Sequence, residues 1–487
     1  MKKYHVATVG GGVIGSAIAF ELSKYDVDVV VIEKGCDVAS ETSKANSGVV
    51  HSGINSKPGS LKARFCVEGN QKIRTLATEL GFSYKNVGKY IIAKNDEERK
   101  ELEKLKKIGI KNNVPDLEIH DKSIVNKKEP YVSCDTGLWV PSAGIILPYE
   151  FTIMLAENAA INDVDFLLKT EVKDIEKKEH HFIIKTNNDM IQSDLLINAS
   201  GLNCKKIVSM VEEPDFNVYP CRGEYLVLDK KFSDLVTSMI YPVPDTKKGV
   251  LGVHITPTVE GNILLGPSAE FIDDLDDKRT TSEKMKILYK EAKEIIPNLP
   301  ADSVINAFSG IRCKLASEKE GGWADYRIFE SKTTPGLINL LGIESPGLTA
   351  APAIAEEIKE MISKKIILKE KETFVIQKKR KRFSEMDLDE KTKLIQKDER
   401  WGRIVCRCEH VTEAEVINAL SNPLGAKTLT AVKYRCRAGL GRCQGGFCTQ
   451  HIVRIMEEDF KMDFKKITLK SPNSNLFYRR NREVKND

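Results

Sequence analysis

Short apolar runs alternate with a glycine turn and a helical pattern at the start of the chain. Residues 4–9 and 27–32 are apolar at most positions, which predicts two buried strands. Residues 16–24, between them, have the spacing of a helix. Buried strands joined by a helix are typical of a parallel sheet. The start of the chain therefore predicts a βαβ unit.

The pattern changes in the middle of the chain. Residues 190–200 (MIQSDLLINAS) and 337–342 (LINLLG) predict further strands that lead into glycine. Several β-rich runs between residues 218 and 266, among them EYLVLD and GNILLGP, instead favour an antiparallel sheet. We therefore expect a second domain that interrupts the first.

The composition changes again after a helical run at residues 353–363. Residues 366–400 hold many lysines and glutamates and few large apolar side chains, which predicts a charged linker with one or two surface helices. We interpret its basic run 378–382 (KKRKR) as a solvated face of this linker. A small module that contains five cysteines begins at Trp401.

Charge and cysteine content narrow the classes of function. The 487 residues include 75 Lys plus Arg and 70 Asp plus Glu, and a net charge of +5 is too small to indicate nucleic-acid binding. No apolar stretch reaches the roughly 18–20 residues of a membrane helix, and we expect a cytoplasmic protein, with peripheral binding at the inner face of the membrane left open. The uneven spacing of the 11 cysteines argues for reduced thiols, some of them metal ligands.

A dinucleotide fingerprint follows the first predicted strand. Gly10, Gly12 and Gly15 form G-x-G-x-x-G between strand and helix, where glycines permit the turn and let a pyrophosphate approach the backbone. Glu33 ends the second strand, where its carboxylate can accept hydrogen bonds from a ribose. This fingerprint does not separate FAD from NAD. Residues 42–53 (TSKANSGVVHSG) favour FAD, since small polar residues here can follow an extended cofactor.

Three segments resemble a known family. GGGVIGSAIAFELS (10–23), ETSKANSGVVHSG (41–53) and SPGLTAAPAIAE (345–356) resemble the glycine-oxidase-type FAD-dependent oxidoreductases. Within that superfamily they are most similar to bacterial α-glycerophosphate oxidases, with L-2-hydroxyglutarate oxidases as near relatives. The resemblance covers roughly residues 4–365. It implies bound FAD and hydride transfer from a C–H bond to flavin N5.

The resemblance implies an α/β fold in which a Rossmann-type FAD-binding domain is interleaved with an antiparallel-sheet substrate domain. Beyond the region of this resemblance, we expect the small cysteine-containing module to be mostly helical. We expect FAD-binding parts at about 1–80, 150–215 and 325–365, substrate-domain parts at about 81–149 and 216–324, the linker at 366–400 and the module with its tail at 401–487.

The same resemblance assigns site residues. The residues expected to contact FAD are Gly10, Gly12, Gly15, Glu33, Lys34, Thr42, Ser43, Asn46, Ser47, Gly48, Val172, Gly201, Gly342, Gly347, Leu348 and Thr349. The segment 342–349 (GIESPGLT) would place a helix N-terminus over the flavin ring, where it would stabilise negative charge on the reduced flavin.

Four residues are candidates for the chemistry. His51 is the expected base, because a neutral imidazole can accept the proton of an alcohol near pH 7. Arg312 is expected to hold the anionic group of the substrate, although Cys313 follows it where the family often has proline. Lys248 is a candidate second phosphate ligand or equally a solvated lysine, and Ser345 is expected to point toward the substrate.

Two cysteine pairs form the second site. Cys406 and Cys408 make C-x-C, and Cys443 and Cys448 make C-x4-C after 34 intervening residues. Four thiolates suit zinc or a 2Fe-2S cluster, and spacing alone does not choose between them. VCRCEHVTEAEV followed by GLGRCQGGFC resembles the bacterioferritin-associated ferredoxin-like domains, which implies a 2Fe-2S cluster with Cys436 as a non-ligand.

These features together predict an FAD-dependent dehydrogenase. We expect it to convert sn-glycerol 3-phosphate to dihydroxyacetone phosphate, with electrons passing to a partner flavoprotein, an acceptor subunit, quinone or a nicotinamide pool. An L-2-hydroxyglutarate-type dehydrogenase is the first alternative, because residues 57–63 (KPGSLKA) also resemble those relatives. A non-catalytic electron-transfer or redox-sensing subunit is the second.

Overall fold

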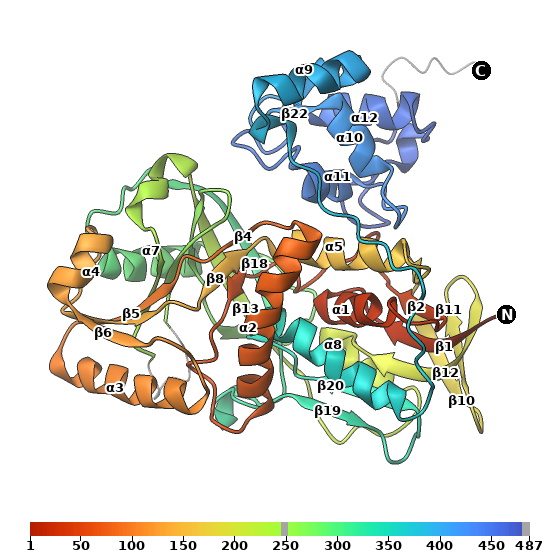
Figure 1. Cartoon of the computed structure of the whole chain (residues 1–487), viewed down its shortest axis with the longest axis horizontal. Helices are drawn as coiled ribbons and strands as arrows, with labels where there is room; N and C mark the ends of the chain where they lie inside the picture. Colours follow the sequence, from red (N-terminus) through yellow and green to blue (C-terminus); the bar gives the residue numbers. More distant parts are fainter. Residues whose placement is uncertain (245–251, 480–487) are drawn as a thin grey trace.

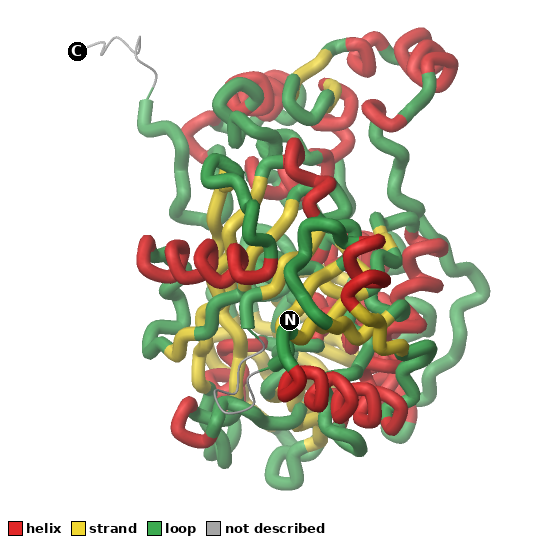
Figure 2. The backbone as a smooth tube through the Cα atoms, turned by 90° about the vertical axis from the view of Figure 1, so that its left-hand side faces the viewer, coloured by secondary structure: helices red, strands yellow, loops and turns green. Residues whose placement is uncertain are grey.

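The computed structural model describes residues 1–244 and 252–479. Two large lobes lie side by side, and a small module packs above them in the views of Figures 1 and 2. Within the described residues, no helix is long and apolar enough to cross a membrane.

A parallel sheet forms the centre of the first lobe. Its strands lie in the order β20 (Leu337–Leu341), β12 (Met190–Asn198), β1 (Lys2–Val9), β2 (Val29–Ile32) and β9 (Asp165–Leu167). The predicted βαβ unit is present, because β1 and β2 pair in parallel and α1 (Val13–Leu22) connects them. The antiparallel strands added at the edges of this sheet are β10 (Val172–Lys177), β11 (Phe182–Thr186) and β19 (Arg327–Glu330).

Helices cover one face of this sheet. The helices that share this core are α1, α2 (Leu61–Leu80), α5 (Pro148–Ala160) and α8 (Gly347–Ser363). A second apolar cluster on the other face joins β10, β11 and α6 (Cys204–Val208) to the sheet. The sheet is thus covered on both faces, as a parallel sheet requires.

The second lobe is built on a nine-stranded, mostly antiparallel sheet. Its strands are β17 (Glu270–Phe271), β13 (Tyr219–Leu228), β16 (Ile263–Gly266), β15 (His254–Pro257), β14 (Met239–Pro242), β5 (Lys89–Ala93), β7 (Thr136–Val140) and β6 (Glu118–Asp121) in that order, with β18 (Val304–Lys314) also paired to β13. Helices α3 (Asp96–Lys111), α4 (Lys122–Lys128) and α7 (Ser282–Ile295) pack on it (Figure 1). Strands from two separate parts of the chain contribute, so this lobe interrupts the first as expected.

A small sheet joins the two lobes. It contains β3 (Val49–Val50), β8 (Gly144–Ile146) and β4 (Tyr84–Lys85). The described residues also form 3-10 helices at Gly201–Asn203, Lys230–Leu235, Glu318–Glu320, Phe383–Glu385, Glu399–Gly402 and Phe464–Lys466.

The segment after α8 is fastened to the first lobe. Its backbone hydrogen-bonds with that of Lys24 and Asp26, and the side chains of Asn158 and Asn162 bind its backbone. It runs along the lobe to the module (Figure 1), and the expected surface helix is α9 (Leu388–Lys397). The prediction that the basic run 378–382 is solvated is wrong for two of its residues, since Lys379 pairs with Glu150 and Arg382 pairs with Glu260.

The module is a compact bundle with its own apolar core. It contains β21 (Ile404–Cys406), β22 (Val411–Thr412), α10 (Glu413–Leu420), α11 (Leu429–Cys436) and α12 (Thr449–Glu458). The helix α10 begins at a capping box, in which Thr412 and Glu415 bond each other's backbone N–H groups.

Candidate functional site

The glycine fingerprint makes a tight turn between β1 and α1. Gly10 has φ of +110°, and a Cβ there would lie 2.6 Å from the carbonyl oxygen of Ala199. A Cβ at Gly15 would lie 2.0 Å from the carbonyl oxygen of Gly10, so the third glycine allows α1 to approach the strand. The turn is thus a cradle that only glycine can form, which fits a pyrophosphate at the helix N-terminus.

Glu33 is held at the end of β2. Its two carboxylate oxygens accept hydrogen bonds from the N–H groups of Gly11 (2.7 Å) and Gly35 (2.6 Å). Burial raises the pKa of this carboxyl, while both N–H groups oppose that shift. The side chain therefore lies beside the glycine turn, where an adenosine ribose would lie in a bound dinucleotide.

A cavity of about 1240 Å³ runs from this turn into the second lobe. The expected site residues that line it are Gly10, Gly12, Glu33, Lys34, Thr42, Ser43, Asn46, Ser47, His51, Val172, Gly201, Arg312, Ser345, Gly347 and Leu348. Gly15, Gly48, Gly342 and Thr349 are outside the lining and lie behind it. Lys248 lies outside the described residues. The cavity thus unites predicted residues from both lobes.

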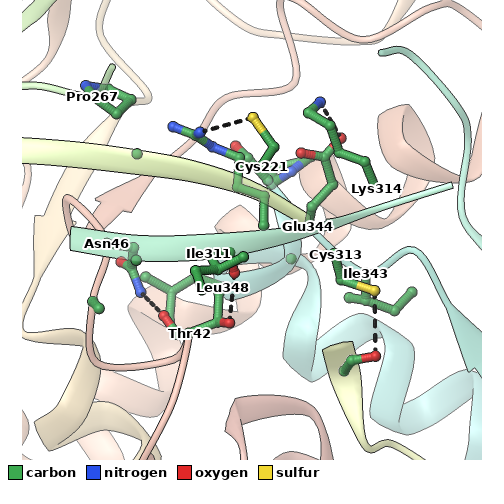
Figure 3. A pocket seen from close by; sticks show the side chains of 18 of the residues that line it. Thr42, Asn46, Cys221, Pro267, Ile311, Cys313, Lys314, Ile343, Glu344 and Leu348 are labelled. Carbon is green, nitrogen blue, oxygen red and sulfur yellow. Dashed lines mark hydrogen bonds and ion pairs between the residues drawn. The ribbon is translucent and has the colours of Figure 1, made fainter. Parts of the chain in front are cut away.

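The segment 42–48 forms one wall of the cavity (Figure 3). Thr42 Oγ1 donates to the carbonyl oxygen of Ile311 at 2.8 Å, which ties this segment to β18. Asn46 Nδ2 donates to the carbonyl oxygen of Ser43 at 2.9 Å, and Asn46 Oδ1 accepts from the N–H of Gly48 at 2.9 Å. The side chains of Thr42 and Asn46 thus hold the shape of this wall through hydrogen bonds to backbone groups.

His51 follows β3 on the same wall. Its backbone N–H donates to Thr349 Oγ1 at 2.9 Å, and its carbonyl oxygen accepts from Asn70 Nδ2 at 2.9 Å. Its Nε2 lies 3.4 Å from Ser345 Oγ. Burial, and next the positive charge of Lys89, lowers the pKa of His51 to about 3. The imidazole is therefore neutral at physiological pH and can accept a proton.

Arg312 lies across the cavity on β18. Its guanidinium donates to the carbonyl oxygen of Ser268 at 3.3 Å and contacts Cys221 Sγ at 3.7 Å. A Cβ at Gly223, on the paired strand β13, would lie 2.6 Å from this guanidinium. The absence of a side chain at Gly223 therefore leaves room for the guanidinium of Arg312 over the sheet. Within the described residues, Arg312 forms no ion pair with a carboxylate, so its charge is available to an anion.

Sequence reasoning missed an ion cluster in the same cavity. Glu344 accepts from Lys62 Nζ at 2.9 Å and from Lys314 Nζ at 3.3 Å, and all three side chains are largely buried. Figure 3 shows Lys314 and Glu344 side by side on the cavity wall. Burial raises the pKa of Glu344, but the two ammonium groups outweigh burial and hold it below its usual value. No local motif marks this cluster, because its members come from distant parts of the chain.

A second missed residue is Lys89, on the central strand β5. This residue is 1% exposed and lines the cavity, and its side chain lies over the ring of Tyr241, with Nζ 4.7 Å from the ring centre. Burial lowers the pKa of Lys89 to about 8. Nothing in the local sequence KYIIA distinguishes it from an ordinary strand lysine.

The four expected ligand cysteines occur as two facing pairs in the module. Cys406 and Cys448 share a hydrogen bond between thiols, which lowers the pKa of Cys406 to about 6 and raises that of Cys448. The pKa of Cys443 is lowered, first by hydrogen bonds from backbone N–H groups such as that of Phe447 and then by the thiol of Cys408. A Cβ at Gly441 would lie 2.2 Å from that of Cys408, so glycine lets the loops meet.

This two-by-two arrangement fits a cluster of two irons, each bound by two thiolates. Within the described residues, no three His, Cys, Asp or Glu side chains gather as ligands of a single ion. Cys436 is buried, its Sγ donates to the carbonyl oxygen of Val432 at 3.2 Å, and burial raises its pKa to about 12. All eleven cysteines are free thiols.

Buried ion pairs dock the module on the first lobe. Arg435 of α11 pairs with Asp37 at 2.5 Å and with Glu157 of α5 at 2.6 Å, and its side chain is only 6% exposed. The rings of Tyr434 and Tyr149 stack beside this contact with centroids 4.4 Å apart. The module is therefore fixed in place against the lobe that forms the nucleotide cradle.

Comparison with known proteins agrees with this geometry. The family model of FAD-dependent oxidoreductases matches residues 5–361, and that of the BFD-like 2Fe-2S binding domain matches residues 404–458. A glycerol 3-phosphate dehydrogenase of Caloramator mitchellensis is 42% identical over 470 residues, which cover 95% of this chain and 96% of that protein. An L-2-hydroxyglutarate dehydrogenase of Arabidopsis thaliana is 30% identical over 73% of this chain and 83% of its own length.

A solved structure shows the same fold in the two lobes. The dithionite-reduced L-α-glycerophosphate oxidase of Mycoplasma pneumoniae with FAD bound superposes with a TM-score of 0.71 at 33% identity, covering 77% of this chain and 98% of that one. The chain belongs to the FAD-dependent oxidoreductases and carries a BFD-like 2Fe-2S binding domain after its oxidoreductase region.

Proposed function

We propose that the protein oxidises sn-glycerol 3-phosphate to dihydroxyacetone phosphate and delivers the electrons to an external acceptor. The observation that carries the substrate is the 42% identity to a glycerol 3-phosphate dehydrogenase across 95% of the chain, which includes the cysteine module. The cavity supports it, because a neutral histidine and an arginine that has no carboxylate partner among the described residues line one pocket beside the nucleotide cradle.

His51 is the proposed base. FAD, when bound, supplies the hydride acceptor, and a 2Fe-2S cluster transfers electrons one at a time. His51 Nε2 takes the proton of the C2 hydroxyl, and Ser345 Oγ, 3.4 Å away, orients that hydroxyl or the imidazole. The hydrogen bonds to Thr349 and Asn70 hold the backbone of His51, so that its ring keeps one position in the cavity.

Arg312 is the proposed anchor for the phosphate. Its planar guanidinium can donate two parallel hydrogen bonds to a phosphate or carboxylate. Its partner Ser268 contributes a neutral carbonyl oxygen, which orients the guanidinium without neutralising it. Lys248 remains a proposed second phosphate ligand from the sequence alone.

The residues proposed to hold FAD follow the length of the cavity. The glycine turn and Glu33 would bind pyrophosphate and ribose, the segment 42–48 would line the flavin, and the N-terminus of α8 at Gly347 would face the pyrimidine edge of the ring. Gly15, Gly48, Gly342 and Thr349 would act from behind the lining by shaping the backbone.

The proposed route out of the protein is the outer side of the module. Cys408 and Cys443 are exposed, whereas Cys406 and Cys448 are buried. A cluster on these four ligands would therefore have one side near solvent, where a partner flavoprotein or another acceptor subunit could approach. The exposed side chains of Arg407 and Arg442 flank these two ligands and favour an acidic acceptor.

An anaerobic visible spectrum of the purified protein tests the substrate. We expect glycerol 3-phosphate to bleach the visible absorbance of the flavin and to lower the iron–sulfur absorbance. Bleaching by L-2-hydroxyglutarate but not by glycerol 3-phosphate would favour the alternative suggested by the Arabidopsis relative. No bleaching by any hydroxy acid or polyol phosphate would favour an electron-transfer subunit without a substrate.

A further inference from the structure

The cavity contains two buried lysines with different surroundings. Lys62 is 3% exposed and its ammonium pairs with Glu344 at 2.9 Å. Lys89 is 1% exposed, and within the described residues its ammonium has neither an ion pair nor a hydrogen bond. An isolated buried charge costs several kcal/mol, so an unpaired buried lysine beside a cavity indicates a ligand that supplies the counter-charge.

The strand register directs Lys89 toward the cavity. Alternate residues of a strand point to the same face, so Lys89 lies on the face of Ile91, and Ile91 packs with Val49 and Ile54 of the segment around His51. Lys89 pairs with Met239 on β14, which places Tyr241 on this same face. The side chain therefore projects from the second lobe toward the wall that carries His51.

The ring of Tyr241 does not replace a counter-ion. A cation over an aromatic ring gains about 0.5–2 kcal/mol, which is less than the cost of burying the ammonium. The other titratable groups that act on Lys89 are His51, which is neutral, and the thiol of Cys66, whose pKa is raised to about 12 by burial. Neither group supplies a negative charge at neutral pH.

We propose that Lys89 binds the phosphate of the substrate, and that it supplies with Arg312 the two positive charges that a phosphate dianion requires. The proposal rests on the proposed oxidation of glycerol 3-phosphate. It also explains why the cavity keeps a charged side chain on a strand whose five residues are all buried. A phosphate monoester carries roughly −1.5 to −2 charges at pH 7, so Arg312 alone would leave it only partly neutralised, and Lys89 supplies a second charge from within the described residues.

The test compares Lys89→Met and Lys89→Arg in the full, FAD-loaded protein. We expect Lys89→Met to raise the KM for glycerol 3-phosphate about 10- to 100-fold, as loss of a charge-assisted contact does, while oxidation of glycerol, which has no phosphate, changes less than about twofold. Lys89→Arg keeps the charge and should recover most of the affinity. The matched control is Lys128→Met, since Lys128 lies over the ring of Trp139 at 3.5 Å but outside the cavity.

Binding measurements keep this test separate from the proposed reaction. Calorimetric titration with inorganic phosphate should show weaker binding to Lys89→Met than to the wild type, whichever substrate the enzyme oxidises. Equal phosphate affinity in the two proteins would overturn the role of Lys89. Equal losses for glycerol and glycerol 3-phosphate would also overturn it, because Lys89 would then act at the reacting carbon. A wild type that binds phosphate but ignores glycerol 3-phosphate would instead contradict only the proposed reaction.

Discussion

The two redox regions of the molecule treat charge in opposite ways. In the cavity between the lobes, Lys89 and Arg312 have no carboxylate partner among the described residues, and His51 stays neutral. At the base of the cysteine module, Arg435 is matched by two carboxylates, and two of the four ligand thiols are open to solvent. Lys62 and Lys314 of the cavity are matched by Glu344, so it is the unmatched charge of Lys89 and Arg312 that marks where a ligand is received, whereas the matched charge of Arg435 keeps the module docked.

The largest expected effect separates the two regions by chemistry. His51→Ala should lower the rate of substrate-dependent flavin bleaching by about 100- to 10,000-fold, because general-base catalysis contributes that much. Stopped-flow absorbance measures this rate. The iron–sulfur absorbance of the resting protein should be unchanged, since His51 lies in the cavity and not in the module.

Cys443→Ser disrupts the cysteine module and leaves the cavity intact, and so complements His51→Ala. It should remove the iron–sulfur absorbance and the reduction of a protein acceptor, while substrate still bleaches the flavin. If His51→Ala bleached at the wild-type rate, or if Cys443→Ser abolished bleaching, the assignment of proton transfer to the cavity and of electron exit to the module would be wrong.

The sequence predicted the nucleotide cradle of the first lobe better than it predicted contacts between segments that lie far apart in the chain. The glycine turn and Glu33 lie within one βαβ unit, so spacing along the chain alone placed them together. The cluster of Lys62, Lys314 and Glu344 depends on three segments that meet only in the folded protein. No periodicity or motif encodes such a contact.

The linker and the docking of the module show the same limit. A high content of lysine and glutamate predicted a solvated linker, yet Lys379 and Arg382 form ion pairs with carboxylates from elsewhere in the chain. Arg435 likewise has two partners that lie 398 and 278 residues away in the sequence. Composition reports how many charges a segment holds, but not which of them find partners.

The next prediction weakens the docking contact. Arg435→Met leaves Asp37 and Glu157 without their partner, and removal of one member of a buried ion pair costs about 3–5 kcal/mol. We expect a separate, earlier unfolding transition of the module in calorimetry. The iron–sulfur absorbance should also respond more slowly to substrate, while the rate of flavin bleaching stays near that of the wild type.

Arg403→Met is the matched control for the docking contact. Arg403 pairs with Glu399 and Glu413 and not with the first lobe, its side chain is 53% exposed, and exposed pairs contribute about 1 kcal/mol or less. A single unchanged unfolding transition in both variants would show that Arg435 does not hold the module in place.

The smallest expected effect concerns pH and the unmatched lysine. The pKa of Lys89 is about 8 in the folded protein, against 10.5 for an ordinary lysine. Between these values the unfolded chain binds more protons than the folded one, so stability rises with pH over this window. The penalty of the buried charge is complete below pH 8, is on the order of 3 kcal/mol at most, and fades toward pH 10.5.

Lys89→Met should therefore be more stable than the wild type at pH 7 without phosphate. Denaturant titrations should show the gap in free energy of unfolding between the two proteins narrowing between pH 8 and 10. A gap that stays constant with pH would show that Lys89 is already neutral or already paired, and the contrast between the cavity and the module would then rest on Arg312 alone.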